Sequence, residues 1–192
     1  VPMPRGSVEI GSRTLLMPTR STLFFIRGAT LTLGLISAIA AHADSPLVAP
    51  KRHTVCSSSG TVCAISDPRA NDTRVVHRPS GKTLWSIPGW HRWLFLSNDG
   101  MSLAIGYAGM NLIPADSSMD LPVIHFYREG RLLRALQLSD LYRSRSQLPR
   151  TASHLQWVEA IRVNNTNQLV LHLITGEIAA FSMQTGRRTS TA

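Results

Sequence analysis

Cysteine, acidic side chains and aromatic rings are all scarce in this 192-residue chain. Two cysteines cannot complete the four-ligand shell of a structural zinc site, and no nearby pair of histidines has ligand spacing, so we expect no metal. With 16% charged and 43% hydrophobic residues, the composition excludes a disordered chain and predicts a globular core. The length limits this core to one ordinary domain with extensions.

Motifs of common catalytic sites are also absent. The chain contains no Gly-x-Ser-x-Gly, no His-Glu-x-x-His and no glycine-rich phosphate loop. The acidic residues that could form a catalytic pair are scattered: Asp99, Asp116, Asp120 and Asp140. We therefore expect a binding function without a cofactor, and keep a hydrolase or lyase with a pocket of His and Asp as an alternative.

No hydrophobic run reaches the roughly 20 residues that span a bilayer. The apolar residues 29–41 follow a basic stretch with Arg20 and Arg27, and they end in Ala41-His42-Ala43, whose small residues fit a signal peptidase site. We predict that residues 1–43 form an N-terminal extension and a signal peptide. The mature protein would then be periplasmic or secreted and would have no transmembrane segment. A buried helix or an uncleaved anchor is the alternative interpretation of this run.

Positive charge remains after removal of the predicted leader. Residues 44–192 carry 16 Lys plus Arg against 10 Asp plus Glu, a net charge of +6. Such a balance favours anionic partners, which outside the cytosol are lipid phosphates, acidic polysaccharide or acidic proteins. We therefore expect a protein or an anionic envelope component as partner, and no nucleic acid.

The two cysteines, Cys56 and Cys63, bracket the sequence Ser-Ser-Ser-Gly-Thr-Val. In an exported chain this pair favours a disulfide over two free thiols. A two-residue turn at Ser59-Gly60 would place the cysteines opposite each other in a hairpin, at a hydrogen-bonded pair with Cα atoms about 5.5 Å apart. The spacing does not match the Cys-x-x-Cys of a redox site.

Short β-branched and apolar runs, separated by Gly, Asn, Asp and Pro, predict an all-β domain over residues 51–184. A Pro-rich segment, 44–50, precedes this domain, and a basic flexible tail, 185–192, follows it. One helical turn is expected at Ser139–Arg143, with Ser139 as its cap. The predicted strands are His53–Ser57, Thr61–Ser66, Thr73–Arg78, Thr83–Ile87, His91–Ser97, Met101–Tyr107, Pro122–Arg128, Arg131–Leu138, Gln156–Val163, Gln168–Ile174 and Glu177–Met183.

A weak internal repeat runs through this domain. An aliphatic residue, a histidine and then a Gly followed by a charged residue recur around His77, His125 and His172, which are 48 and 47 residues apart. A comparison of Ser97 with Asn164 gives a different offset, 67, and both registers cannot hold. The shorter period equals one four-stranded propeller blade.

On these features, residues 51–184 resemble the blade repeats of secreted bacterial β-propeller-like proteins. The resemblance implies an antiparallel meander of short strands, arranged as an incomplete propeller of about three blades. An open twisted sheet or a small sandwich fits the same pattern. Because single-chain propellers have four to eight blades, closure of a ring would need a partner chain, such as a second copy in a homo-oligomer.

Contacts with a partner are expected from the strand-end residues 98–100, from an aromatic turn and from two loops, 108–121 and 143–154. The turn carries a tryptophan beside basic residues, which suits stacking on a sugar ring or seating on a protein, although capping of the core is the alternative. The second loop is basic, and a solvated loop is its alternative interpretation. The candidate binding residues are Trp90, Arg92, Asn111, Asp116, Asp120, Arg143, Arg145 and Arg150. We interpret the chain as a small exported binding protein, with a structural subunit of a β-assembly as the alternative.

Overall fold

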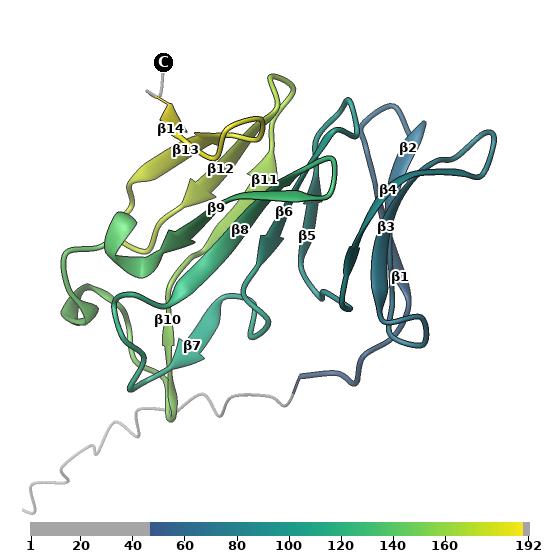
Figure 1. Ribbon diagram of the computed structural model, residues 1–192. Helices are drawn as coiled ribbons and strands as arrows, with labels where there is room; N and C mark the ends of the chain where they lie inside the picture. Colours follow the sequence, from purple (N-terminus) through teal and green to yellow (C-terminus); the bar gives the residue numbers. More distant parts are fainter. Residues whose placement is uncertain (1–46, 190–192) are drawn as a thin grey trace, which may run out of the picture. The chain divides into compact units, whose positions relative to one another are not determined.

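Consecutive strands pair with their chain neighbours through most of residues 47–189, which are the residues that the computed structural model describes (Figure 1). Three four-stranded antiparallel sheets and one two-stranded sheet are formed within these residues. The predicted signal peptide lies outside the described residues. In residues 47–189, no helix has the length and apolarity needed to cross a membrane.

The first sheet is a meander in which each strand pairs with the next along the chain. Alternation places Ala64, Val75 and Ile87 on one buried face of this sheet. Its strands are β1 (His53–Cys56), β2 (Val62–Asp67), β3 (Asp72–His77) and β4 (Lys82–Pro88).

The second and third sheets repeat this order, with one interruption. The second sheet contains β5 (Leu94–Leu96), β6 (Ser102–Gly106), β8 (Pro122–Arg128) and β9 (Arg131–Gln137). The third contains β11 (Ala160–Val163), β12 (Gln168–His172), β13 (Ile178–Ser182) and β14 (Arg188–Thr189). The remaining elements lie in two insertions, one between β6 and β8 and one between β9 and β11. The first contains β7 (Leu112–Pro114), and the second contains the 3₁₀ turns η1 (Leu138–Asp140) and η2 (Arg145–Gln147) and the strand β10 (His154–Gln156), which pairs with β7.

Two hydrophobic clusters join the three sheets. In one, Ala64 and Val75 of the first sheet pack with Leu103 of the second. In the other, Phe126 of the second sheet packs with Phe181 of the third, at a ring separation of 6.2 Å. The second sheet is therefore covered on both faces. This is the packing of successive propeller blades, and it confirms the predicted incomplete three-blade, propeller-like architecture.

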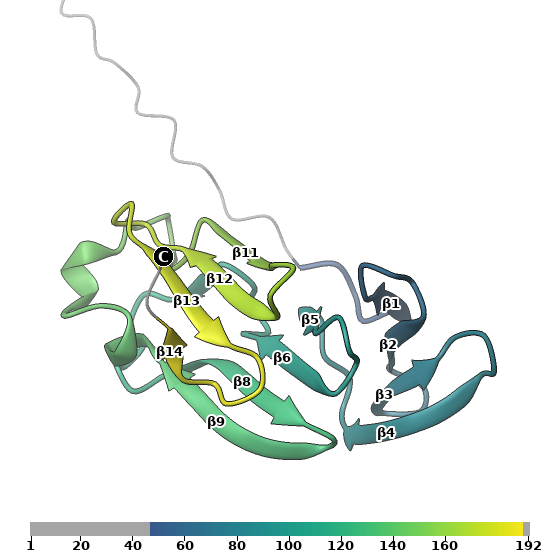
Figure 2. The same ribbon diagram turned by 90° about the horizontal axis from the view of Figure 1, so that it is seen from above.

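The first strands of the sheets lie together. β5 contacts both β1 and β11, and Figure 2 shows these three strands along one side and β4 and β9 along the other. Their hairpin tips are linked by hydrogen bonds: Ser58 Oγ donates to Asn98 Oδ1 over 2.8 Å, and the Asn98 N–H donates to Asn167 Oδ1 over 2.7 Å. Ser57, Ser97 and Asn164 start equivalent tips, because the backbone N–H of each donates across its hairpin, to the carbonyls of Val62, Ser102 and Gln168 respectively.

The histidine repeat expected from the sequence is wrong. His77 ends the third strand of its sheet and His125 lies within a third strand, whereas His172 ends a second strand. The register that aligns Ser97 with Asn164 is the one the structure adopts. Equal sequence spacing fails to give equal positions because one insertion separates β6 from β8 and the other separates the second sheet from the third.

Several local predictions also need correction. The helical turn expected at Ser139–Arg143 is the 3₁₀ turn η1, which begins one residue earlier and is capped at Gln137, whose N–H donates to Asp140 Oδ2 over 2.9 Å. Strands β7, β10 and β14 were not predicted. Because β14 pairs with β13, the described part of the expected basic tail belongs to the third sheet.

The disulfide between Cys56 and Cys63 is present. Its Cα atoms are 3.9 Å apart, closer than the hydrogen-bonded geometry we expected. The neighbouring pair is the hydrogen-bonded one, since the Ser57 N–H donates to the Val62 carbonyl over 2.8 Å. The cysteines therefore occupy the closer, non-hydrogen-bonded type of pair.

Candidate functional site

The connection between the first and second sheets, residues 89–93, is fixed by buried hydroxyl groups. Ser66 Oγ accepts the His91 N–H over 2.8 Å and lies 2.9 Å from Thr73 Oγ1. The Thr73 hydroxyl in turn donates to the Gly89 carbonyl over 2.9 Å. Gly89 has φ +90°, a conformation that a side chain would strain. This connection is therefore held in one path directly after β4.

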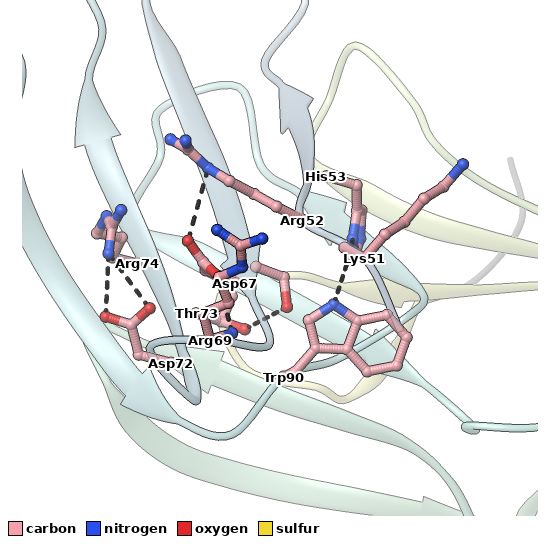
Figure 3. Close-up of polar contacts among 10 residues, drawn as sticks. Lys51, Arg52, His53, Asp67, Arg69, Asp72, Thr73, Arg74 and Trp90 are labelled. Carbon is pink, nitrogen blue, oxygen red and sulfur yellow. Dashed lines mark hydrogen bonds and ion pairs between the residues drawn. The ribbon is translucent and has the colours of Figure 1, made fainter. Parts of the chain in front are cut away.

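Trp90 and Arg92, both predicted binding residues, hold the N-terminal segment of the domain. Trp90 Nε1 donates to the Lys51 carbonyl over 2.9 Å, a bond visible in Figure 3. The Arg92 guanidinium donates to the Val48 carbonyl over 2.6 Å and lies 5.0 Å from the centre of the Trp90 ring. The edge of His53 packs on the same indole at 6.0 Å. Trp90 is thus half-buried rather than exposed in its turn.

Behind this tryptophan lies a cavity of about 390 Å³. Three chain segments form it: the connection after β4, the end of β6 with the turn that follows, and β8. Side chains with rings supply most of its wall, and the cavity size falls within the usual range for small-molecule sites. The lining residues are Trp90, His91, Arg92, Ile105, Gly106, Tyr107, Ala108, Pro122, His125 and Tyr127.

Burial favours the neutral form of both histidines of this cavity. Burial lowers the pKa of His91; the hydrogen bond to the Pro88 carbonyl opposes this shift, and His125 adds to it. Burial likewise lowers the pKa of His125. Because a carbonyl can only accept, His91 Nε2–H donates to Pro88 over 3.1 Å, which leaves Nδ1 as an acceptor. The histidine rings can therefore offer uncharged faces and hydrogen-bonding nitrogens.

The other polar groups of the lining are the Arg92 guanidinium and the phenols of Tyr107 and Tyr127. Burial raises the pKa of Tyr127. No carboxylate lies among the described residues that line the cavity. The arrangement can therefore hold a ring by stacking and hydrogen bonding, and its lining residues supply no carboxylate partner for the histidines.

The other predicted binding residues lie in the two insertions. The pairing of β7 with β10 brings these insertions together, and Arg145 donates to the carbonyls of Ala115 and Ser117 over 3.4 and 3.2 Å. The Asn111 carbonyl accepts the Trp157 N–H over 3.0 Å. Exposed side chains on these loops are Asp116, Asp120, Arg143 and Arg150. None of the predicted residues in the insertions lines the cavity.

The candidate binding residues did not include four ring residues of the cavity: His91, Tyr107, His125 and Tyr127. Of these, His125 entered the sequence analysis only through the histidine repeat. The sequence did indicate that His125 and Tyr127 lie on one face of a sheet, because they are two positions apart in a predicted strand. Their approach to the connection after β4 depends on how two sheets pack, which sequence spacing does not encode.

Comparison with known proteins found no matching family model and no matching curated protein. Among solved structures, the chain is similar to a eukaryotic initiation factor, with a TM-score of 0.44 and 14% identity over 73% of this chain and 31% of that one. It is also similar to the WD40 repeats of RRP9, with a TM-score of 0.40 and 13% identity over 75% and 39% of the two chains. For hydrazine synthase of Kuenenia stuttgartiensis the TM-score is 0.37, with 14% identity over 71% and 35%. The chain thus spans about a third to two fifths of these structures. The assignment of blades rests on the strand order and packing described above.

Proposed function

We propose that this chain is an exported binding module, and that the cavity behind Trp90 receives a flat ring of its partner. The observation that carries the proposal is the convergence of Trp90, Tyr107 and Tyr127 with two neutral histidines around one cavity. Aromatic walls favour a planar guest, because ring faces and edges pack closely and bury large apolar areas.

The hydrogen-bonding groups of the cavity support a guest that carries an N–H or O–H donor. Burial lowers the pKa of both histidines and so favours their uncharged forms, and the Arg92 guanidinium is engaged with the Val48 carbonyl and the Trp90 ring. Nδ1 of His91 can accept a hydrogen bond from the guest. An indole or a phenol carries such a donor on a planar ring. We therefore favour the tryptophan or tyrosine side chain of a partner protein.

Export is supported by two independent features. The leader pattern of residues 17–43 matches a signal peptide. The Cys56–Cys63 disulfide fits an oxidising compartment, where such bonds persist.

The proposal can be tested by NMR titration of the isotopically labelled protein with indole, phenol and methyl β-glucoside as probes. We expect indole and phenol to shift the imidazole signals of His91 and His125 with a saturable dependence on concentration. Ala108→Trp, which fills the cavity from its exposed turn, should abolish the shifts. Ala152→Trp is the matched control, because this alanine is also in an exposed loop, and should leave them unchanged.

A response to the glucoside alone would identify the guest as a sugar and not as an aromatic side chain. No saturable response to any probe, or equal responses in both variants, would contradict the proposed function.

A second candidate, a subunit of a larger β-assembly, is favoured by the packing of the sheets. The first and third sheets each pack on another sheet through one face only. Ile178 on the outward face of the third sheet is 45% exposed. Sedimentation analysis over a range of concentrations tests this candidate, since a ring of two copies requires a dimer.

A further inference from the structure

The outward face of the first sheet is built from alternate residues of all four strands. Cross-strand pairing aligns Thr54, Ile65 and Arg74 in one row. The disulfide and Val76 form the next row. No other described sheet packs on this face; instead it contains a cleft of about 590 Å³. The cleft residues are Arg52, Thr54, Cys56, Cys63, Ile65, Arg74, Val76, Arg78, Gly81 and Thr83.

Two of the three arginines of this cleft have carboxylate partners. Arg52 Nε lies 3.8 Å from Asp67 Oδ2, and an Arg74 guanidinium nitrogen lies 3.2 Å from Asp72 Oδ2; Figure 3 shows both pairs. Within residues 47–189, Arg78 has neither a carboxylate within ion-pair distance nor a hydrogen bond from its side chain. One guanidinium with its donors unused therefore remains at the end of the cleft.

The floor between the arginines is apolar. Its accessible part is supplied by Ile65, which is partly exposed, and by the exposed Cys56 of the disulfide. Cys63 and Val76 lie beneath them, only 2% and 8% exposed. A small ion alone would leave Ile65 and Cys56 against water, and an aliphatic molecule alone would leave Arg78 without an acceptor. The surface is therefore complementary to a molecule that has both an aliphatic part and an anionic group.

A second copy of the chain does not provide that chemistry. The outward face of the third sheet, which a ring would bring against the first sheet, presents Arg162, Val170, His172, Ile178 and Ala180 in its paired rows. None of these residues carries a carboxylate for Arg78, and Arg162 adds a like charge. Covering Arg78 with such a face would cost the desolvation of an unpaired cation.

We propose that the outward face of the first sheet binds an amphiphilic anion, an aliphatic chain that ends in a carboxylate or a phosphate. The aliphatic chain lies on Ile65 and on the exposed Cys56 side of the disulfide, and the anionic group is held by Arg78, whose planar guanidinium suits two-point contact with either group. This site lies on a different sheet face from the cavity behind Trp90, so its test is independent of the proposed function.

Calorimetric titration of the purified protein at low salt tests the proposal, with octanoate, octyl phosphate, octanol and inorganic phosphate as probes. We expect saturable binding of octanoate and octyl phosphate at least tenfold tighter than that of octanol or inorganic phosphate. Arg78→Gln should weaken binding of the two anions at least fivefold. Arg131→Gln is the matched control, because this arginine is exposed on β9, and should leave binding unchanged.

Sedimentation with vesicles distinguishes a membrane lipid from a free amphiphile as the source of the anion. Binding to phosphatidylglycerol but not phosphatidylcholine vesicles, lost in Arg78→Gln, would assign the anion to a membrane lipid. Binding of octanoate without vesicle binding would assign it to a free amphiphile. Octanol binding as tightly as octanoate, inorganic phosphate binding as tightly as octyl phosphate, or equal loss in both arginine variants would overturn the proposal.

Discussion

Removal of the disulfide by the double substitution Cys56→Ala and Cys63→Ala should destabilise the domain by an amount that the loop length sets. The cysteines are separated by 7 positions. In the chain-entropy treatment, a closed loop of this size restricts the unfolded chain by roughly 8 cal/mol/K, or about 2.5 kcal/mol at 25 °C. For a domain of nearly 150 residues, such a loss lowers the melting temperature by roughly 5–10 °C.

Urea unfolding of wild type and variant, followed by tryptophan fluorescence, measures this difference. The free energy of unfolding of the wild type in excess reductant should equal that of the variant. The variant itself should not respond to reductant, because residues 47–189 contain no free cysteine besides the disulfide pair that it lacks. A loss below about 0.5 kcal/mol would refute the reasoning that the cross-link restricts the unfolded chain. A variant less stable than reduced wild type would show that packing of the sulfur atoms matters as well.

Three further substitutions test other parts of the structure. Tyr142→Phe should lower the free energy of unfolding by about 1–3 kcal/mol, because it leaves the buried Trp157 carbonyl without its donor. Burial raises the pKa of Tyr142 to about 12, so ionisation of this phenol should lower the melting temperature of the wild type above pH 10. The variant lacks the phenol and should not show this decrease. His125→Gln should reduce the loss of stability between pH 7 and pH 5, since the lowered pKa of His125 favours folding above about 6.5 and this contribution disappears as the pH falls; an unchanged pH profile of thermal unfolding would speak against a buried neutral imidazole. Asn167→Gly keeps the positive φ of this residue but removes the acceptor of the Asn98 N–H, so hydrogen exchange at that amide should accelerate by roughly three- to tenfold; Asn167→Ala should be less stable still, and identical exchange in wild type and the glycine variant would exclude the bond.

Most of the strands could be predicted from the sequence, because alternation and turn residues are patterns within a few neighbouring positions. Alternating apolar residues and turn residues such as Glu129-Gly130 mark β8 and β9, and both residues of this turn have positive φ. The cysteine pairing was predicted for the same reason, since only a short hairpin separates the two residues. Strands β7 and β10 were missed because each is three residues long and pairs with a partner far along the chain.

The candidate site shows the corresponding limit. Trp90 and Arg92 were predicted as binding residues, with capping of the core as the alternative for Trp90. Both contact the N-terminal segment, and the other ring residues of their cavity come from the connection after β4, the turn after β6 and β8. Alternation identifies which face of β8 carries His125 and Tyr127. It does not identify which element lies against that face, because this depends on how the first two sheets pack.

The location of a bound ring tests the central claim most directly. Intermolecular nuclear Overhauser effects between indole protons and the described side chains would give this location in the wild-type protein. The account predicts contacts from indole to His125, Tyr127 and Ile105, which line the cavity. Contacts confined to the exposed Leu132 and Leu133 of β9 would contradict it.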